Sequence, residues 1–111
     1  MKGDHIGEFE ELVLLAVHGL GEGAYGVSVQ QLLEGETSRN VSLGAVYAAL
    51  DRLDTKGLLR SALAAGTAVR GGRSRRAFAL TPSGTRALEA VRRIRDRLYR
   101  AFPVRPARGR A

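Results

Sequence analysis

The stretch that decides the fold lies in the middle of the chain and reads SLGAVYAALDRLDTKGL, residues 42–58. Its apolar residues repeat at helical spacing, at Val46, Leu50 and Leu53, and predict one buried face. Ser42 is suited to cap this helix, because its hydroxyl accepts a hydrogen bond from a free backbone N–H. The glycine near the end of the stretch is suited to stop it. The opposite face carries small or polar side chains.

Two more helices are expected before this stretch. The first is predicted by an apolar stripe made of Ile6, Phe9, Val13, Val17 and Leu20, which neighbouring leucines widen. A helix that is apolar on most sides usually lies at the centre of a fold. A glycine-rich turn over residues 19–24 separates it from a second helix, expected from Tyr25 to Glu34 with Gly35 as its C-terminal stop.

The chain after residue 57 predicts a hairpin and a last helix. Two strand-like runs, Leu58 to Ala64 and Arg75 to Leu80, flank a loop of small residues and arginines. Thr81-Pro82 starts the last helix, which is expected to run to about Phe102. The fold class is therefore mainly α (α+β): a winged helix-turn-helix of three helices and a two-stranded wing, with an appended C-terminal helix.

Basic charge is concentrated after residue 38. Residues 1–38 carry one Lys and seven acids, whereas residues 39–111 carry seventeen basic residues and four acids, and the whole chain has a net charge of +7. This asymmetry favours a polyanion as partner. General solubility is the alternative, and an anionic membrane surface fits less well because the basic residues do not flank a strongly apolar face.

The composition excludes several classes of protein. The chain has no Cys, which excludes disulfides, thiolate metal sites and Cys nucleophiles. His5 and His18 have no third ligand spaced to join them, so we expect no metal and no cofactor. No Ser/His/Asp pattern and no glycine-rich phosphate loop is present, and an enzyme is not expected. The apolar run at residues 12–17 is too short to span a bilayer and follows acids, so we expect a cytoplasmic protein without a signal peptide.

Three segments carry a resemblance to a known family. Residues 42–53, followed by KGLL at 56–59, resemble the recognition helix and next strand of PadR-type transcriptional regulators. The stretch GGRSRRAFALTPSG, residues 71–84, resembles their wing and the start of their last helix, and Tyr25-Gly26 resembles the opening of their second helix. The resemblance covers about residues 6–100. The family often has Tyr where this chain has Ala77 or Ala79, and often Pro where it has Ser74. We expect no large effector domain.

This resemblance implies a DNA-binding regulator whose third helix enters the major groove. Small residues on that helix leave room for close approach to the bases, and long donors are few, so we expect DNA shape to contribute to recognition. The residues expected to contact DNA are Arg39, Asn40, Ser42, Gly44, Ala45, Tyr47, Ala48, Arg52, Arg70, Arg73, Arg75 and Arg76. The alternatives are a packing role for Tyr47 and solvated hairpin arginines.

The resemblance also implies a homodimer built from the last and first helices. The interface is expected to consist of Phe9, Leu12, Leu88, Val91, Ile94, Leu98 and Phe102. The arginines on the other faces of the last helix are expected to be solvated. The chain would then comprise a winged helix-turn-helix domain over residues 1–80, a dimerisation helix over 81–102 and a disordered basic tail over 103–111.

The leading hypothesis is a repressor that binds a pseudo-palindromic operator with half-sites about one DNA turn apart. Its release by a small aromatic molecule, or by changing abundance, is implied by the resemblance. The alternative is a winged-helix protein-interaction adaptor without specific DNA binding, which the acidic N-terminal helix would suit. RNA binding is disfavoured because aromatic residues, which stack on bases, make up only 5% of the chain.

Overall fold

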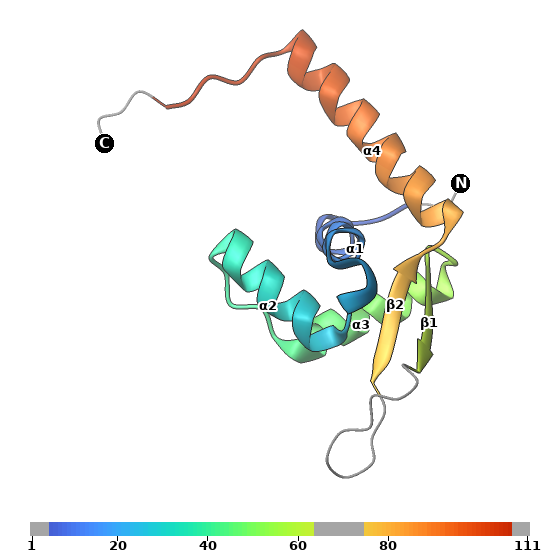
Figure 1. The fold of residues 1–111 in the computed structure, drawn as a ribbon. Coiled ribbons are helices and arrows are strands. Elements are labelled where there is room, and N and C mark those ends of the chain that lie inside the picture. Colours follow the sequence, from blue (N-terminus) through green and yellow to red (C-terminus); the bar gives the residue numbers. More distant parts are fainter. Residues whose placement is uncertain (1–4, 64–74, 108–111) are drawn as a thin grey trace.

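A computed structural model describes residues 5–63 and 75–107 of the chain, so that Arg70 and Arg73 lie outside the described residues. Helices α1, α2 and α3 precede a two-stranded antiparallel sheet, and helix α4 follows it (Figure 1). The elements are α1 (Glu8–Leu20), the short 3₁₀ turn η2 (Gly21–Gly23), α2 (Gly26–Thr37), α3 (Leu43–Thr55), β1 (Leu59–Leu63), β2 (Arg76–Leu80) and α4 (Pro82–Ala101). This is the expected order of elements and the expected fold class.

The core lies where α1 packs against α2, α3 and the sheet. Helix α1 contributes Val13, Leu14 and Val17, all essentially inaccessible to solvent. The predicted buried face of α3 is confirmed, because Val46, Leu50 and Leu53 are each 0% exposed. Since α3 turns these apolar residues into the core, the exposed side chains on its other face are available to an external partner.

Both ends of α3 are formed by the residues that the sequence predicts, Ser42 at its start and Gly57 after its end. The Ser42 Oγ accepts a hydrogen bond from the Ala45 N–H at 3.0 Å. At the other end, Gly57 adopts a φ of 79°, and the N–H of Leu58 donates to the Leu53 carbonyl at 2.9 Å. A positive φ is easy for glycine alone, which explains why the helix ends there.

The end of α2 differs from the expectation. The helix continues through Gly35 to Thr37, and Ser38 adopts the left-handed conformation with a φ of 57°. Two hydrogen bonds extend it: Thr37 Oγ1 donates to the Leu33 carbonyl at 2.7 Å and the Ser38 N–H donates to the Glu34 carbonyl at 3.1 Å. Gly35 as a stop is therefore wrong, because these bonds hold the following residues in the helix.

The hairpin is fixed to the turn that follows α1. Its register pairs Ser61 with Phe78 and Leu59 with Leu80. The ring of Phe78 is buried, and its N–H donates to the Ala24 carbonyl at 2.9 Å. Both strands lie within the ranges expected from the sequence.

Helix α4 begins on the body of the protein and then leaves it (Figure 1). Thr81 Oγ1 caps it by accepting the Gly84 N–H at 3.1 Å, as predicted. A Cβ on Gly84 would overlap the carbonyl of Leu58, so the helix start approaches the body closely. Leu88 packs partly against the core, whereas the apolar residues of the last turns are exposed. Among the helices that the structure describes, none is both long and apolar enough to cross a membrane.

Candidate DNA interface

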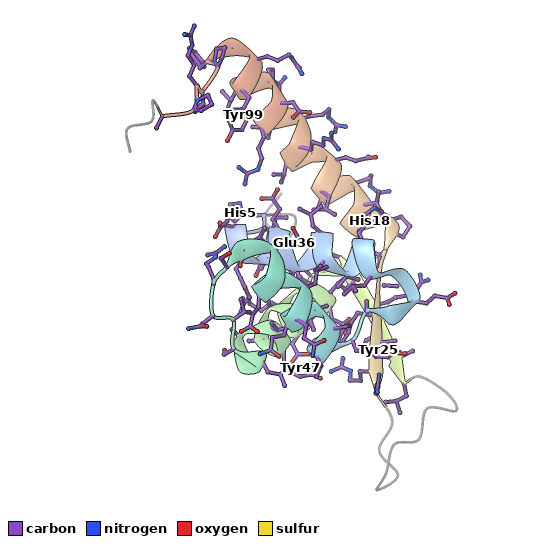
Figure 2. All side chains as sticks on the ribbon, turned by 60° about the vertical axis from the view of Figure 1, so that its left-hand side comes forward. His5, His18, Tyr25, Glu36, Tyr47 and Tyr99 are labelled. Carbon is purple, nitrogen blue, oxygen red and sulfur yellow. The ribbon has the colours of Figure 1, made fainter. Side chains whose placement is uncertain are left out.

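The outward face of α3 is built mainly from small residues. Its exposed residues are Gly44, Ala45, Tyr47, Ala48, Asp51, Arg52 and Thr55. Helical spacing puts Gly44 and Ala48 near the middle of this face, with Arg52 on one flank and Tyr47 on the other. In Figure 2, Tyr47 and Tyr25 lie at the opposite end of the molecule from Tyr99 of α4. We call the small-residue surface around Gly44 and Ala48 the recognition face.

Tyr47 both packs within the domain and reaches solvent. A Cβ on Gly26 would overlap its ring, so the tyrosine lies directly on the start of α2. The residue nevertheless keeps 38% of its surface exposed. The Tyr25-Gly26 pair and Tyr47 belong to two different segments that resemble the family, and the structure brings these two segments into contact.

Consecutive arginines of the hairpin have different surroundings. The Arg75 guanidinium lies over the Tyr25 ring, 5.0 Å from its centroid. In this arrangement the face of the ring attracts the positive charge of the guanidinium. Arg76 donates to Ser61 Oγ at 2.8 Å and lies 3.4 Å from a carboxylate oxygen of Asp51 on α3. Arg76 also lies 3.5 Å from Asp54 Oδ2. It therefore ties the sheet to α3, and it neutralises an acid beside the recognition face.

The turn before α3 lies beside a groove of about 350 Å³. Phe9 and Leu12 of α1 line this groove together with Arg39, Asn40, Val41, Ser42 and Ala45. Arg39 lies 3.5 Å from Glu8 Oε2, and both side chains are more than half exposed. The two α1 residues expected in the dimer interface thus border the candidate DNA-contacting turn.

Glu10 is the site residue that the sequence analysis missed. It is 7% exposed, and its carboxylate accepts hydrogen bonds from Arg52 Nε and from Lys56 Nζ, both at 2.8 Å. Burial alone would raise the pKa of the Glu10 carboxyl, but the hydrogen bonds from Lys56 and Arg52 outweigh it and hold the pKa below its usual value of 4.5. One signal could have revealed the residue: Glu10 precedes Val13, Leu14 and Val17 by 3, 4 and 7 positions, and it therefore lies on the buried stripe.

The last turns of α4 carry an apolar stripe that is open to solvent. Ile94, Leu98 and Phe102 are 51%, 55% and 72% exposed, and Tyr99 is exposed beside them. Arg95 joins this helix to α1 through a bond of 2.6 Å to Glu11 Oε1 and one of 3.3 Å to Oε2. Leu15 of α1, which was not expected in an interface, is also exposed.

Comparison with known proteins connects this arrangement to a family of regulators. The sequence model of the family described as "Transcriptional regulator PadR-like family" matches residues 14–90. A PadR-like transcription factor from Bacteroides fragilis has a similar structure, with a TM-score of 0.70 and 27% identity over 84% of each chain. A PadR family transcription regulator from hypervirulent Clostridium difficile gives a TM-score of 0.58 and 26% identity, over 82% of this chain and 96% of that one.

A more distant structure shares the fold alone. It is the ORC1 protein of Aeropyrum pernix in complex with DNA, with a TM-score of 0.62 and 23% identity over 84% of this chain and 27% of that one. No curated protein matches the chain.

Proposed function

The chain belongs to the PadR-like family of transcriptional regulators, and on that premise we propose that it is a dimeric repressor that binds a pseudo-palindromic operator. As a DNA-binding regulator of this family it is not an enzyme. The domain over residues 1–80 binds DNA, and the helix over residues 81–102 joins two copies.

One observation carries the proposal: α3 buries Val46, Leu50 and Leu53 and presents small side chains at the middle of its outward face. Gly44, Ala45 and Ala48 are exposed, so the helix backbone can approach base edges in the major groove. Alanine methyl groups can also touch the methyl group of thymine. Because few long donors lie on this face, DNA shape supplies part of the specificity.

The surroundings of α3 supply contacts to phosphates. Arg39, Asn40 and Ser42 lie where the chain enters the helix, and Arg75 lies beside the start of α2. Basic and hydroxyl side chains in such positions fix the register of a protein on the duplex without reading its sequence. Arg70 and Arg73 stay predictions for contacts of the hairpin loop.

The partner proposed for α4 is a second copy of the chain. Ile94, Leu98 and Phe102 leave a continuous apolar stripe exposed, and burying it against the same stripe of another copy would remove it from water. A two-fold axis pairs identical surfaces, and the resulting dimer would present two recognition helices to two half-sites. We add Leu15 and Tyr99 to the expected interface.

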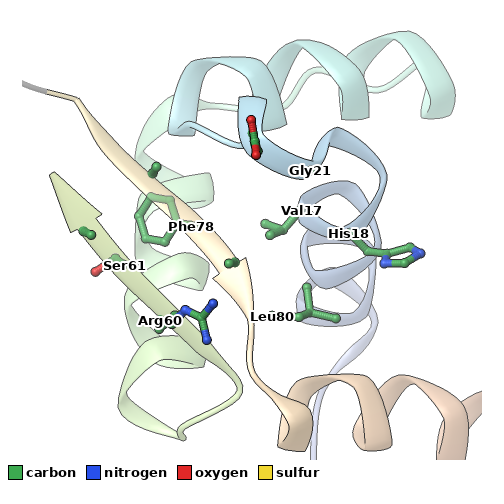
Figure 3. Close-up of a pocket in the computed structure, with 11 residues that line it drawn as sticks. Val17, His18, Gly21, Arg60, Ser61, Phe78 and Leu80 are labelled. Atoms are coloured by element: carbon green, nitrogen blue, oxygen red, sulfur yellow. The ribbon is translucent and has the colours of Figure 1, made fainter. Parts of the chain in front are cut away.

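A pocket of about 460 Å³ is the candidate site for a small aromatic effector (Figure 3). Ala62, Ala77 and Ala79 of the sheet line it, together with Arg60 of the same sheet and His18 of α1. A ligand there would contact both α1 and the hairpin, and it could alter how the hairpin meets DNA. The variant Ala79→Tyr would fill this space and abolish release of DNA by such a ligand.

Selection of binding sites from a pool of random duplexes tests the proposed function. We expect enrichment of two inverted half-sites whose centres lie about 10 bp apart, or a multiple of that spacing. Enrichment of a single half-site would contradict the dimeric arrangement, and no enrichment at all would contradict sequence-specific binding.

A further inference from the structure

Glu10 connects the centre of the domain to the edge of the recognition face. Among the described residues, it is the buried one that carries a charge. Its Oε2 atom accepts from Arg52 of α3 and its Oε1 atom accepts from Lys56, the residue that follows this helix, so both oxygens are used by side chains one turn apart. The Lys56 ammonium also donates to the His5 carbonyl at 2.8 Å. The Lys56 ammonium therefore makes its hydrogen bonds to groups within the domain.

Arg52 is held differently from Lys56. It contacts Glu10 through the Nε atom, and its side chain is 54% exposed. Within residues 5–63 and 75–107, its terminal Nη nitrogens form no hydrogen bond. A guanidinium has five N–H donors in a fixed plane, so fixing Nε also fixes the direction of the other donors. The paired Nη groups suit the two oxygens of a phosphate.

We propose that Glu10 is a positioning residue that holds Arg52 by its Nε atom and thereby presents its Nη groups to a DNA phosphate beside the recognition face. This role rests on the proposed function. It deepens that function by giving α1 a direct part in DNA affinity. Glu10 itself does not touch DNA.

The direction in which one substitution changes DNA affinity separates a positioning role from a simple charge effect. The variant Glu10→Gln removes a negative charge, and a simple charge effect would tighten binding to polyanionic DNA. A positioning role predicts the opposite, because an amide holds the guanidinium less firmly, and the arginine then has to lose more side-chain freedom when it binds DNA. A matched control is Glu36→Gln, since Glu36 is exposed and makes no ion pair within the part of the chain that the structure describes.

The experiment measures binding of the full chain to a selected duplex by fluorescence anisotropy. We expect Glu10→Gln to weaken binding by about tenfold, and Glu36→Gln to leave it unchanged or slightly tighter. Arg52→Ala should also weaken binding by about tenfold, and adding Glu10→Gln to Arg52→Ala should cause no further loss. Equal losses from Glu10→Gln with and without Arg52 would overturn the proposal, as would tighter binding by Glu10→Gln.

A second variant decides the question if Glu10→Gln does not fold. Arg52→Lys keeps the charge on a largely exposed side chain but lacks the rigid fork of donors. We expect it to bind as weakly as Arg52→Ala, and wild-type affinity would overturn the proposal. If the unaltered chain bound no duplex at all, the proposed function would fail first, and this role would fail with it.

Discussion

The ring of Tyr47 on α3 lies against Gly26 at the start of α2, in the space that a Cβ on Gly26 would occupy. Gly26 is buried, and Tyr47 is 38% exposed. This close contact joins the two helices of the helix-turn-helix, and it holds the tyrosine at the border of the recognition face.

Gly26→Ala tests this contact. The added methyl group must displace the Tyr47 ring, and we expect a loss of about 1–3 kcal/mol in the free energy of unfolding, measured with urea. Gly35→Ala in the same helix is the control. It has open space around it and lies inside the helix, so it should raise stability by about 0.5–1 kcal/mol. A similar loss from both variants would contradict the contact.

Tyr47→Phe separates packing from DNA contact. The ring is retained, so the free energy of unfolding should change by less than about 0.5 kcal/mol. If the hydroxyl donates to a phosphate, DNA affinity should fall by about tenfold, as expected for a hydrogen bond to a charged group. Unchanged affinity in an anisotropy titration would assign Tyr47 to packing alone.

Leu98→Asp tests the partner proposed for α4. A carboxylate placed on the apolar stripe would have to lose its water on dimerisation, so sedimentation at micromolar concentration should show a monomer. Arg100→Asp puts the same acid on another face of the helix and should leave the dimer intact. A wild-type chain that sediments as a monomer, or a dimer that survives Leu98→Asp, would contradict this interface.

Glu10 should make stability depend on pH in acid. Its pKa in the folded chain lies below the usual 4.5 that applies on unfolding, so the folded state binds fewer protons and stability rises with pH. The contribution is therefore present above pH 4.5 and is lost as the pH falls through the lower, folded pKa. Urea unfolding between about pH 6 and about pH 3 should show this loss, and Glu10→Gln should reduce the slope while Glu36→Gln keeps more of it. An equal slope in both variants would argue against the buried carboxylate.

Much of the fold could be predicted because its signals are local. Ser42 and Gly57 delimit α3 through hydrogen bonds within a few residues, and Thr81 does the same for the start of α4. The end of α2 differs from the predicted stop at Gly35 because Thr37 Oγ1 and the Ser38 N–H donate to carbonyls one turn earlier, a choice that the sequence pattern alone does not show. The Glu34 carboxylate accepts the Val41 N–H at 3.1 Å and holds the turn that follows the extended helix.

The site was less predictable, because charge partners come from distant segments. The sequence predicts DNA contacts for Arg52 and Arg39 from their places in and just before α3. Their contacts with Glu10 and Glu8 join residues more than 30 positions apart, and no local pattern predicts them. Glu10 lies on the buried stripe of α1, and its partners Arg52 and Lys56 are 42 and 46 positions away in the sequence. Leu88, Phe9 and Leu12 of the expected interface are partly buried against the core of their own chain, and their contact with a partner stays a prediction.

Sequence-specific DNA binding is tested most directly by anisotropy titrations of the full chain against a duplex from its own upstream region and a random duplex, over a series of salt concentrations. Phosphate contacts should give a steep loss of affinity with salt for both duplexes, and readout of bases and shape should give a preference of at least about 1,000-fold for the upstream duplex. Salt-sensitive binding without preference for this or any selected duplex would contradict a specific regulator. Absence of binding even at low salt would favour a protein-interaction adaptor instead.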